Sequence, residues 1–456
     1  MHPAQTLHRS APWTPPNDGR RRLCSTPVTV THRSPRAKGS DDPTRGPAHA
    51  RAAKGSLLRT VGLVTTGVLV FGTTAAAAVA ATLYDNVTVG DVTGLTGDLE
   101  KPEPADPSAG EPLNVLLIGS DFRGGENTDF AVSGVEGMRS DTSIVAHVSA
   151  DRSRVELVSI PRDSMVDRPE CTMSDGTTVA GEHAMFNTAF AVGADHGDDI
   201  ASAAACAINT VQSTTGVYID DYAVVDFAGF EKMIDAIGGV QMCIPEPIDN
   251  PKADLVLEAG NQTLDGAEAL GFARARYGIG DGSDLSRIGR QQQLLAATMS
   301  QVLSQNLLTD APSLVKFLSA ATESLTVSPG LSSIPDLTGL AYSLRGLSGG
   351  NITFMTIPNG PDPADPNRVV WTSDATDVWS RMAADEPITG EPETVPASDA
   401  PATGDDAGTS DAGTGDAGTG TDATGTDGAD ETTPTPQQTK TAGTEAFTSD
   451  DVTAVC

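Results

Sequence analysis

One uncharged run divides this chain into parts that can fold only in different surroundings. Residues 60–82 carry no charged side chain and are rich in Val, Leu, Gly and Ala. As a helix rising 1.5 Å per residue, a run of this length crosses a hydrocarbon core of ~30 Å. A cleaved signal peptide is the alternative, because residues 75–78 and 80–81 are all alanine and offer small-residue cleavage sites. The basic stretch ahead of the run is longer than a signal peptide carries, so we expect an uncleaved transmembrane helix.

Charge is split unevenly across this run. Residues 1–59 hold 11 Lys and Arg against 3 Asp and Glu and are rich in Pro and Ser, which predicts a disordered basic arm. The net charge is +8 before the run, whereas 18 basic and 58 acidic residues follow it, so the arm is expected in the cytoplasm. We therefore expect a single-pass protein of the cell membrane whose larger part is extracellular. This topology explains the arm, and no nucleic-acid partner is expected.

The part after the run divides further by composition. Residues 83–111 contain several Pro and Asp and are expected to form a tether. Residues 112–386 are long enough to bury a full hydrophobic core as one domain. From 387 to 456 the chain is dominated by Asp, Gly, Thr, Ala and Pro, with a near-repeat at 411–420. Such a stretch predicts an acidic, disordered tail.

Five cysteines are split between the two sides of the run. Cys24 lies in the basic arm, which leaves four in the outer part. An even number in an oxidising compartment predicts disulfides, and four cysteines permit three pairings. We expect Cys171 to pair with Cys206, because a polar loop carries the first and a short helical stretch soon after it carries the second. Pairing of Cys243 with Cys456 stays open, and no spacing resembles a zinc site.

The periodicity of the core mixes strands and helices. Short apolar runs bounded by turn residues predict strands at residues 114–119, 143–148, 155–160, 221–226, 240–244 and 351–357. Longer runs with helical spacing predict helices at residues 201–211, 227–237, 285–307, 312–324 and 334–344. Since the two kinds interleave along the chain, we expect an α/β fold in which a sheet is layered with helices.

Arginine is scarce after the run but concentrated in one segment. Only 13 arginines follow residue 59, yet four stand within 17 positions, with a glutamine directly after them: Arg274, Arg276, Arg287, Arg290 and Gln291. Two more, Arg139 and Arg162, stand close to aspartates beside apolar runs. An acidic protein that gathers arginine in this way is expected to bind a multiply charged anion, because the planar guanidinium matches phosphate oxygens two at a time. The alternative is a set of ion pairs on a solvated face.

The spacing of these arginines predicts how they meet. Arg274 and Arg276 are two residues apart, so both face one way only if the segment is extended. Arg287, Arg290 and Gln291 are three and four residues apart, which puts them on one face of a helix. We expect an extended pair and a helix face, joined by a Gly-rich loop, to close around a diphosphate. The loop is not a P-loop, because no Gly-Lys-Ser/Thr follows it.

Two aspartates stand at the edges of predicted strands. Asp121 follows the first of these strands, and Asp141 precedes the second. Paired carboxylates of this kind hold a hard divalent cation, Mg²⁺ or Mn²⁺, which bridges to pyrophosphate oxygens. The alternative is that each aspartate caps a turn. Arg123 and Arg139 nearby favour the metal site, because metal, arginine and pyrophosphate neutralise one another.

The order of these motifs resembles that of a known family. The segments that carry the likeness run in order over residues 114–293 and read NVLLIGSDFR, RSDTSIVAHV, VELVSIPRDS, DYAVVDFAGFEKMIDAIGGV and LDGAEALGFARARYGIGDGSDLSRIGRQQQ. With the single span before them, they resemble the LytR-CpsA-Psr family of cell-wall glycopolymer transferases, in its actinobacterial type. The resemblance implies an α/β domain outside the membrane, with a central mixed β-sheet flanked by helices. It also implies a Mg²⁺-dependent phosphotransferase that moves a glycopolymer from a polyprenyl pyrophosphate carrier onto peptidoglycan through a phosphodiester.

Two other functions stay open beside this one. The same residues would serve a polyprenyl pyrophosphatase, with water in place of the sugar hydroxyl. A membrane-bound regulatory protein of the cell envelope, without transferase activity, is the other. For the transferase, the expected partners are a polyprenyl-pyrophosphate-linked glycopolymer, a peptidoglycan acceptor and membrane lipid.

The resemblance implies roles for single residues. Asp121 and Asp141 would be the carboxylates linked to Mg²⁺, and Arg123 and Arg290 would bind substrate. The residues that would contact or adjoin the pyrophosphate are Arg139, Arg162, Arg274, Arg276, Arg287 and Gln291. Where many members have Lys-Ile-Asn, this chain reads Met-Phe-Asn at 185–187, so one phosphate contact of the family is missing.

Overall fold

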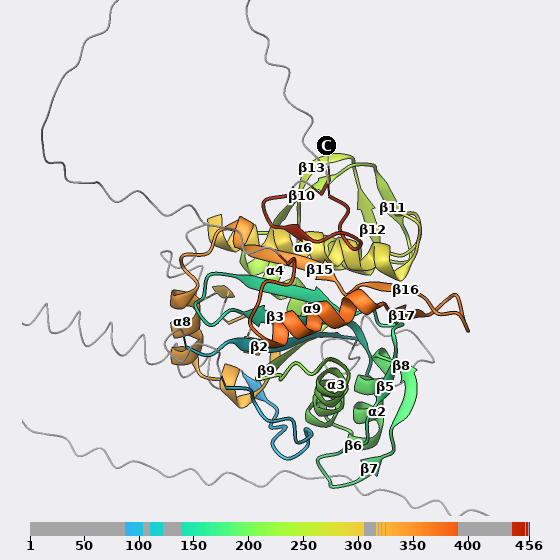
Figure 1. Ribbon diagram of the computed structural model, residues 1–456. Helices are drawn as coiled ribbons and strands as arrows, with labels where there is room; N and C mark the ends of the chain where they lie inside the picture. Colours follow the sequence, from blue (N-terminus) through green and yellow to red (C-terminus); the bar gives the residue numbers. More distant parts are fainter. Residues whose placement is uncertain are drawn as a thin grey trace, which may run out of the picture. The chain divides into compact units, whose positions relative to one another are not determined.

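The computed structural model describes residues 87–103, 110–121, 138–304, 325–390 and 440–451, with short pieces at 316–317, 319–320, 322–323, 453–454 and 456 (Figure 1). The expected basic arm and membrane span, Arg123, about half of the helix expected at 312–324 and residues 391–439 of the expected tail lie outside this part. Among the residues described, no helix is both long enough and apolar enough to cross a membrane.

The fold is built on an eight-stranded sheet. Its strands in spatial order are β1 (Thr88–Val89), β14 (Leu325–Val327), β9 (Asp221–Val225), β2 (Leu113–Ser120), β3 (Ser140–Val148), β4 (Val155–Ser159), β15 (Ile352–Thr356) and β18 (Phe447–Thr448). The pairs β1–β14, β9–β2 and β4–β15 are parallel, and the other neighbours are antiparallel. The expected central mixed sheet flanked by helices is therefore confirmed.

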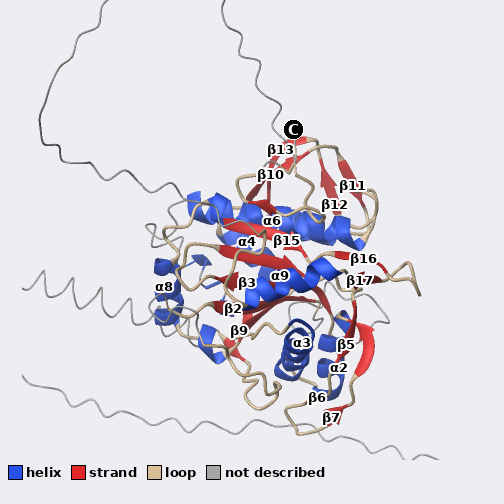
Figure 2. Cartoon of the chain, viewed as in Figure 1, coloured by secondary structure: helices blue, strands red, loops and turns tan. Residues whose placement is uncertain are grey.

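Helices cover both faces of this sheet. Successive side chains of a strand point to opposite faces, and the strands carry apolar side chains on both. Leu116 and Ile118 of β2 share one core with α2, α3 and α9. Val115 of the same strand points to the other face and shares a second core with Ala296 of α6. The helices of the first face are α2 (Asn187–Gly197), α3 (Ile200–Thr215) and α9 (Ser373–Ala383), and those of the second are α4 (Phe227–Ala236) and α6 (Asp284–Ser304) (Figures 1 and 2).

Side-chain caps explain where several helices begin. Asp199 accepts a hydrogen bond from a backbone amide in the first turn of α3, and Asp226 does the same for α4. Helix α5 (Gly266–Arg274) starts with a capping box formed by Asp265 and Glu268, and it packs against α4 and α6. Helix α3 ends at Gly216, whose φ of 73° suits glycine.

Smaller elements surround the sheet. The two-stranded pairs are β5–β8 (Met165–Arg168, Glu182–Met185), β6–β7 (Cys171–Thr172, Thr178–Val179), β10–β13 (Val240–Ile244, Gly260–Leu264), β11–β12 (Ile248–Asn250, Leu255–Leu257) and β16–β17 (Asn359–Pro361, Val369–Trp371). The remaining described helices are α8 (Ile334–Ser343) and the 3-10 turns η2 (Pro329–Leu331) and η3 (Gly349–Asn351). Strands β10 to β13 share a third core with α4, α5 and α6, to which Val240, Leu264 and Leu294 contribute.

The described residues between 440 and 456 depart from the expected disordered tail. Strand β18 in this segment pairs with β15, and the buried ring of Phe447 stacks on Phe354 with centroids 5.2 Å apart. Cys456 forms a disulfide with Cys243 of β10. The prediction of disorder is wrong here because it rested on the average composition of residues 387–456. The few residues that anchor this segment, an aromatic and a cysteine among them, are outnumbered in that average.

The expected pairing of Cys171 with Cys206 is present, with Cα atoms 5.2 Å apart. It joins β6 to α3 within a small apolar cluster on the α2–α3 side of the sheet. Both sulfur-bearing side chains are fully buried. With the Cys243–Cys456 bond, this disulfide makes up one of the three pairings that the four outer cysteines permit.

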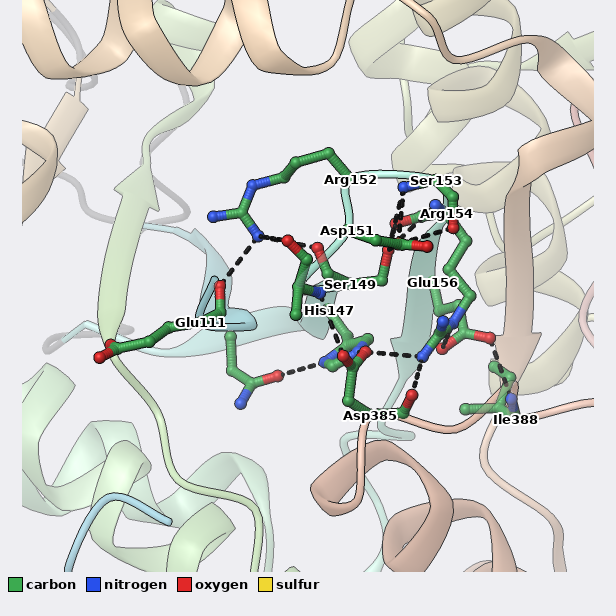
Figure 3. A network of polar contacts seen from close by, with 12 residues as sticks. Glu111, His147, Ser149, Asp151, Arg152, Ser153, Arg154, Glu156, Asp385 and Ile388 are labelled. Atoms are coloured by element: carbon green, nitrogen blue, oxygen red, sulfur yellow. Dashed lines mark hydrogen bonds and ion pairs between the residues drawn. The ribbon is translucent and has the colours of Figure 1, made fainter. Parts of the chain in front are cut away.

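A buried polar network lies at the end of the sheet where β3 finishes (Figure 3). The imidazole of His147 is fully buried, and its Nε2 is 3.0 Å from Asp385 Oδ1. Arg154 donates to the same oxygen at 2.7 Å. The carboxylate of Glu156 accepts the amide of Ile388 at 2.9 Å. These contacts fasten the chain after α9 to strands β3 and β4.

Candidate functional site

A cavity of about 500 Å³ lies between the sheet and the helices α4, α5 and α6. Apolar side chains from these helices form much of its wall, among them Phe227, Phe230, Met233, Leu270, Leu294 and Leu295. The charged and amide residues that line it are Asp226 and six residues proposed from the sequence: Asp141, Arg162, Arg274, Arg276, Arg287 and Gln291. Its volume is within the range of ~300–1,000 Å³ typical of ligand sites. Six of the residues proposed from the sequence thus meet in one cavity, although they come from three separate stretches of the chain.

One carboxylate links three of these arginines. Asp284, the first residue of α6, forms an ion pair with Arg287 through its Oδ1. The same oxygen lies 3.3 Å from Arg276 Nη2 and 3.3 Å from Arg162 Nε. Its other oxygen is buried and receives no hydrogen bond from the described residues. Three guanidinium groups thus meet at one carboxylate, and Asp141 and Asp163 also pair with Arg162, so the three positive charges face three negative ones.

Asp141 ties the start of β3 to the same cluster. Its Oδ1 accepts a hydrogen bond from Arg162 at 2.8 Å and lies 3.9 Å from Arg287 Nη1. Burial alone would raise the pKa of Asp141, but the charges of Arg287 and Arg162 and the hydrogen bond outweigh it and hold the pKa below its ordinary value. The Asp141 carboxylate is therefore ionised at neutral pH.

Arg274 and Arg276 are not the extended pair expected from their spacing. Helix α5 runs through Arg274 and ends there, and its C-cap Ala275 has an extended ψ of 132°. Both arginines nevertheless line the cavity, because the chain turns between them. The guanidinium of Arg274 lies over the ring of Phe227, 4.5 Å from its centroid. The expected extended segment is thus wrong, although both arginines line the cavity.

Helix α6 presents only part of the expected set to the cavity. Arg287 and Gln291 line it, and Gln291 Nε2 donates to the carbonyl of Ala273 at 3.3 Å. Arg290 does not line it. Its guanidinium instead donates to the carbonyl of Ala275 and, at 3.0 Å, to Ser286 Oγ. In this structure Arg290 joins the end of α5 to α6.

Asp121 and Arg139 face each other at the end of the β2–β3 pair, beside the cavity. The amide of Asp121 donates to the carbonyl of Arg139 at 3.0 Å, and the amide of Arg139 donates to the Asp121 carboxylate at 2.7 Å. Neither residue lines the cavity, and the Arg139 side chain is exposed. Asp141 lies two residues after Arg139, at an irregularity in the β2–β3 register where Gly119 pairs with Thr142 and Ser120 with Ser140.

This placement of carboxylates fits Mg²⁺ in one respect. Mg²⁺ is usually held by one or two carboxylates, with phosphate oxygens and water completing its shell. Asp121 and Asp141 would supply two hard oxygen ligands on neighbouring strand ends beside the arginine cluster. Among the described residues no group of three or more His, Cys, Asp or Glu is arranged to hold a metal.

The missing family lysine leaves an apolar position near Arg162. Met185 ends β8 opposite Met165 of β5, and Phe186 is buried. The backbone amide of Asn187 donates to the carbonyl of Arg162 at 3.1 Å. The side-chain oxygen of Asn187 is buried and accepts no hydrogen bond within the described part of the chain. Met185 therefore places an apolar side chain where the family has a charge, and the polar oxygen of Asn187 lies two residues further along the chain.

Asp284 was not singled out from the sequence, and the sequence left open whether the helix expected at residues 227–237 lines a ligand site or packs as ordinary core. A signal for Asp284 existed, since an acidic residue at the first position of a helix pairs with an arginine three residues on. The wall gave no such signal, because Phe227, Phe230 and Leu294 have the same helical spacing as ordinary core residues. Only their assembly in the fold distinguishes a cavity wall from a filled core.

Comparison with known proteins gives this site a context. The LytR_cpsA_psr family model matches residues 76–383. The cell wall biosynthesis protein LcpA of Corynebacterium glutamicum is 34% identical over 261 residues, which is 54% of this chain and 49% of LcpA. The polyisoprenyl-teichoic acid–peptidoglycan teichoic acid transferase TagU of Enterococcus faecalis is 30% identical over 216 residues, which is 47% of this chain and 62% of TagU.

A solved LytR-Csp2A-Psr enzyme from Actinomyces oris is 22% identical, with a TM-score of 0.45 over 63% of this chain and 95% of that one. The chain spans about half the length of the Corynebacterium relatives it matches. The family model, by contrast, covers well over half of the chain, including every described residue that lines the cavity. The chain belongs to the LytR-CpsA-Psr family.

Proposed function

We propose that this protein is a phosphotransferase that moves a glycopolymer from a polyprenyl pyrophosphate carrier onto peptidoglycan. The observation that carries the proposal is the composition of the cavity, where an arginine cluster and apolar helix faces line one space. A lipid diphosphate has the same two halves, a charged head and an apolar tail. A site for a free sugar phosphate would have no use for the apolar wall.

The arginines have a direct part in the proposed reaction. The oxygen of an acceptor hydroxyl attacks the phosphorus that carries the polymer, and the bond from that phosphorus to the bridging oxygen breaks. Polyprenyl phosphate then leaves, and the polymer is joined through a phosphodiester. Arg162, Arg276 and Arg287 stabilise the negative charge that builds on the phosphoryl oxygens during this step. Because Asp284 and Asp141 hold the guanidinium groups in place beforehand, little reorganisation is needed.

A metal ion is part of the proposal. Asp121 and Asp141 are the residues that would hold Mg²⁺, or Mn²⁺, beside the diphosphate. The ion would supply positive charge to the diphosphate oxygens. Asp141 suits this role because its lowered pKa keeps it ionised.

Attachment to the membrane completes the proposal. A span at residues 60–82 would hold the domain beside the bilayer that carries its lipid-linked substrate, which raises the effective concentration without any new contact. Residue 87, where the described part begins, follows the span within a few positions. The catalytic domain would lie outside the cell.

The names of relatives support a transferase. TagU of Enterococcus faecalis and TagV of Bacillus subtilis are both named polyisoprenyl-teichoic acid–peptidoglycan teichoic acid transferases. The residues that make up the cavity and its arginine cluster lie inside the segment that the family model matches. The polymer that this chain transfers is left open by the proposal.

The test is a reconstituted reaction. Purified protein is given a polyprenyl-pyrophosphate-linked glycan and peptidoglycan in the presence of Mg²⁺, and products are separated by chromatography and mass spectrometry. Polymer bound to peptidoglycan, together with one equivalent of polyprenyl phosphate, supports transfer. Lipid phosphate released at the same rate without peptidoglycan would make the protein a pyrophosphatase. If the lipid is not consumed, the result would favour a regulatory protein without transferase activity.

A further inference from the structure

A glutamine next to the cavity points away from it. Gln292 follows Gln291 on α6, and successive helical residues point about 100° apart. Gln291 lines the cavity, whereas the Gln292 side chain is fully buried on another side of the helix. A buried amide must be hydrogen-bonded to be tolerated, so its partners show what it holds together.

On one side Gln292 is bonded to the sheet. Its Nε2 donates to Ser159 Oγ at 3.0 Å and to Thr356 Oγ1 at 3.2 Å. Ser159 and Thr356 are the last residues of β4 and β15, and they are paired with each other. Arg162 follows Ser159 by three residues. The amide of Gln292 therefore fixes α6 against the strand end from which Arg162 emerges.

On the other side Gln292 is bonded to the returning segment, residues 440–451. Its Oε1 accepts the backbone amide of Gly443 at 3.1 Å. Gly443 has a φ of 90°, and an added Cβ there would lie 2.6 Å from the carbonyl oxygen of Leu285. An added Cβ on Gly289 of α6 would likewise collide with the carbonyl of Ala442. Backbone meets backbone along the first turns of α6, where Asp284 and Arg287 stand.

We propose that Gln292, held between the strand ends and the returning segment, is a positioning residue for the arginine cluster. It fixes the rotation and height of α6 and thereby sets Arg287 and Asp284 against Arg162. This role rests on the proposed function, because it concerns the geometry in which a lipid diphosphate is bound. The returning segment is then part of the catalytic domain's machinery, although it is separated from the remainder in sequence by residues 391–439.

The ion pairs between α6 and the strand ends depend on the position of α6. Arg162 Nε lies 3.3 Å from Asp284 Oδ1, and Arg287 Nη1 lies 3.9 Å from Asp141 Oδ1. Each of these contacts joins α6 to a strand end. Charge-assisted hydrogen bonds and ion pairs weaken as donor and acceptor move apart or out of line. A small rotation of α6 would therefore weaken diphosphate binding while leaving the fold in place.

The first test uses side chains of similar length. Gln292→Met removes all three hydrogen bonds, whereas the control Gln293→Met removes a single 3.3 Å bond to the carbonyl of Thr453. The probe is farnesyl diphosphate with Mg²⁺, titrated into the full chain by calorimetry at a temperature where every variant is folded. We expect affinity to fall about tenfold or more in Gln292→Met and to stay within about twofold of wild type in Gln293→Met.

A conservative variant distinguishes positioning from plain loss of stability. Gln292→Glu in its neutral form keeps one donor and an acceptor for the Gly443 amide. Burial raises the pKa of such a carboxyl, so the neutral form gains population as the pH falls. Affinity of Gln292→Glu, relative to wild type at the same pH, should therefore recover between pH 8 and pH 5. The Met variant should show no such recovery.

A backbone variant tests the returning segment itself. Gly443→Ala forces a Cβ against Leu285, whereas Gly176→Ala, at a similar φ of 84°, meets nothing within 4 Å. We expect only Gly443→Ala to weaken farnesyl diphosphate binding. Wild-type affinity in both Gln292→Met and Gly443→Ala would overturn the positioning role while leaving the proposed function standing. Failure of the wild type to bind farnesyl diphosphate or to transfer polymer would instead overturn the proposed function.

Discussion

At the scale of single residues, the site depends on how carboxylates and guanidinium groups share their contacts. Asp284 Oδ1 meets Arg162, Arg276 and Arg287, while Asp141 meets two of the three. Removal of one partner from a buried set of this kind leaves an uncompensated charge, so simple truncation would confuse folding with catalysis. Substitutions that keep the charge or the shape of a side chain separate an effect on catalysis from an effect on folding.

Replacement of an arginine by lysine tests the geometry of the cluster. Arg276→Lys and Arg287→Lys keep the positive charge but offer a point charge in place of a planar, two-pronged donor. We expect transfer to fall roughly ten- to a hundred-fold, which corresponds to about 1.5–3 kcal/mol. The measurement is the transfer rate at saturating lipid substrate.

The control for these variants is Arg345→Lys, whose guanidinium donates to the carbonyl of Tyr342 away from the cavity. It should transfer at the wild-type rate. Melting temperatures of all three variants decide between the two explanations. If Arg276→Lys and Arg287→Lys lose stability in step with activity, the cluster is a structural ion-pair network, which the sequence alone left open.

Asp141→Asn tests the proposed metal site. The change keeps the side chain's size and removes one anionic ligand, so the Mg²⁺ concentration for half-maximal activity should rise several-fold. Activity should partly recover at high Mg²⁺, since Asp121 remains. Asp163→Asn is the matched control, because Asp163 lies 3.6 Å from Arg162 Nε without lining the cavity. An unchanged Mg²⁺ requirement in Asp141→Asn would place the metal elsewhere.

At the scale of elements, prediction from sequence succeeded where a segment had one strong period. Strands β2, β3, β4 and β9 and helices α4 and α6 lie within a few residues of their expected ranges. Helix α5 was missed because the spacing of Arg274 and Arg276 favoured an extended segment. Its capping box, Asp265 with Glu268, was the competing signal. The capping box was therefore a better guide to the structure of this segment than the spacing of two arginines.

The network after α9 gives an element-scale prediction on pH. Burial would raise the pKa of Asp385, but the hydrogen bond from His147, a backbone amide and the charge of Arg154 hold it below its ordinary value. Such a group stabilises the fold above its unfolded-state pKa, ~3.9, and this contribution is lost as the pH falls through the folded value. The difference in unfolding free energy between wild type and Asp385→Asn should therefore be full at pH 5–7 and shrink below about pH 4.

Glu156 supplies the opposite sign in the same network. Burial raises its pKa above the ordinary value, outweighing the Ile388 amide and the nearby cations. Its contribution to stability is present below its unfolded-state pKa and is lost as the pH rises through the folded value. Urea unfolding gives the difference in unfolding free energy between wild type and each variant. As the pH rises, this difference should grow for Asp385→Asn and shrink for Glu156→Gln. Parallel slopes would mean that the network titrates through other groups.

At the scale of the whole molecule, composition gave a wrong prediction for one segment, the C-terminal end of the expected disordered tail. The expected core of residues 112–386 accounts for most of the described fold. The return of residues 440–456 to strand β15 and β10 could not be read from sequence, because long-range pairing leaves no local pattern and two-residue strands have no period. For the same reason the partner of Cys243 stayed open until the structure placed Cys456 beside it.

The Cys171–Cys206 pair yields a prediction for global stability. The bond separates residues 35 apart, and closure of such a loop commonly contributes ~3–4 kcal/mol. Cys171→Ala with Cys206→Ala should therefore lower the melting temperature on the order of 10 °C. Transfer at 25 °C should stay near wild type, because the bond lies in the α2–α3 layer across the sheet from the cavity. A loss of transfer without a fall in melting temperature would contradict both statements.

The second disulfide turns part of the chain into a covalent ring. Cys243 and Cys456 are joined, and between them in sequence lie α6, strand β15 and residues 391–439, which connect Gly390 to Lys440. One proteolytic cut within residues 391–439 would open this ring without releasing either piece. Under denaturing conditions the cut protein would migrate as two fragments only after reduction. Detachment of the returning segment thus requires two separate chemical events, a hydrolysis and a reduction.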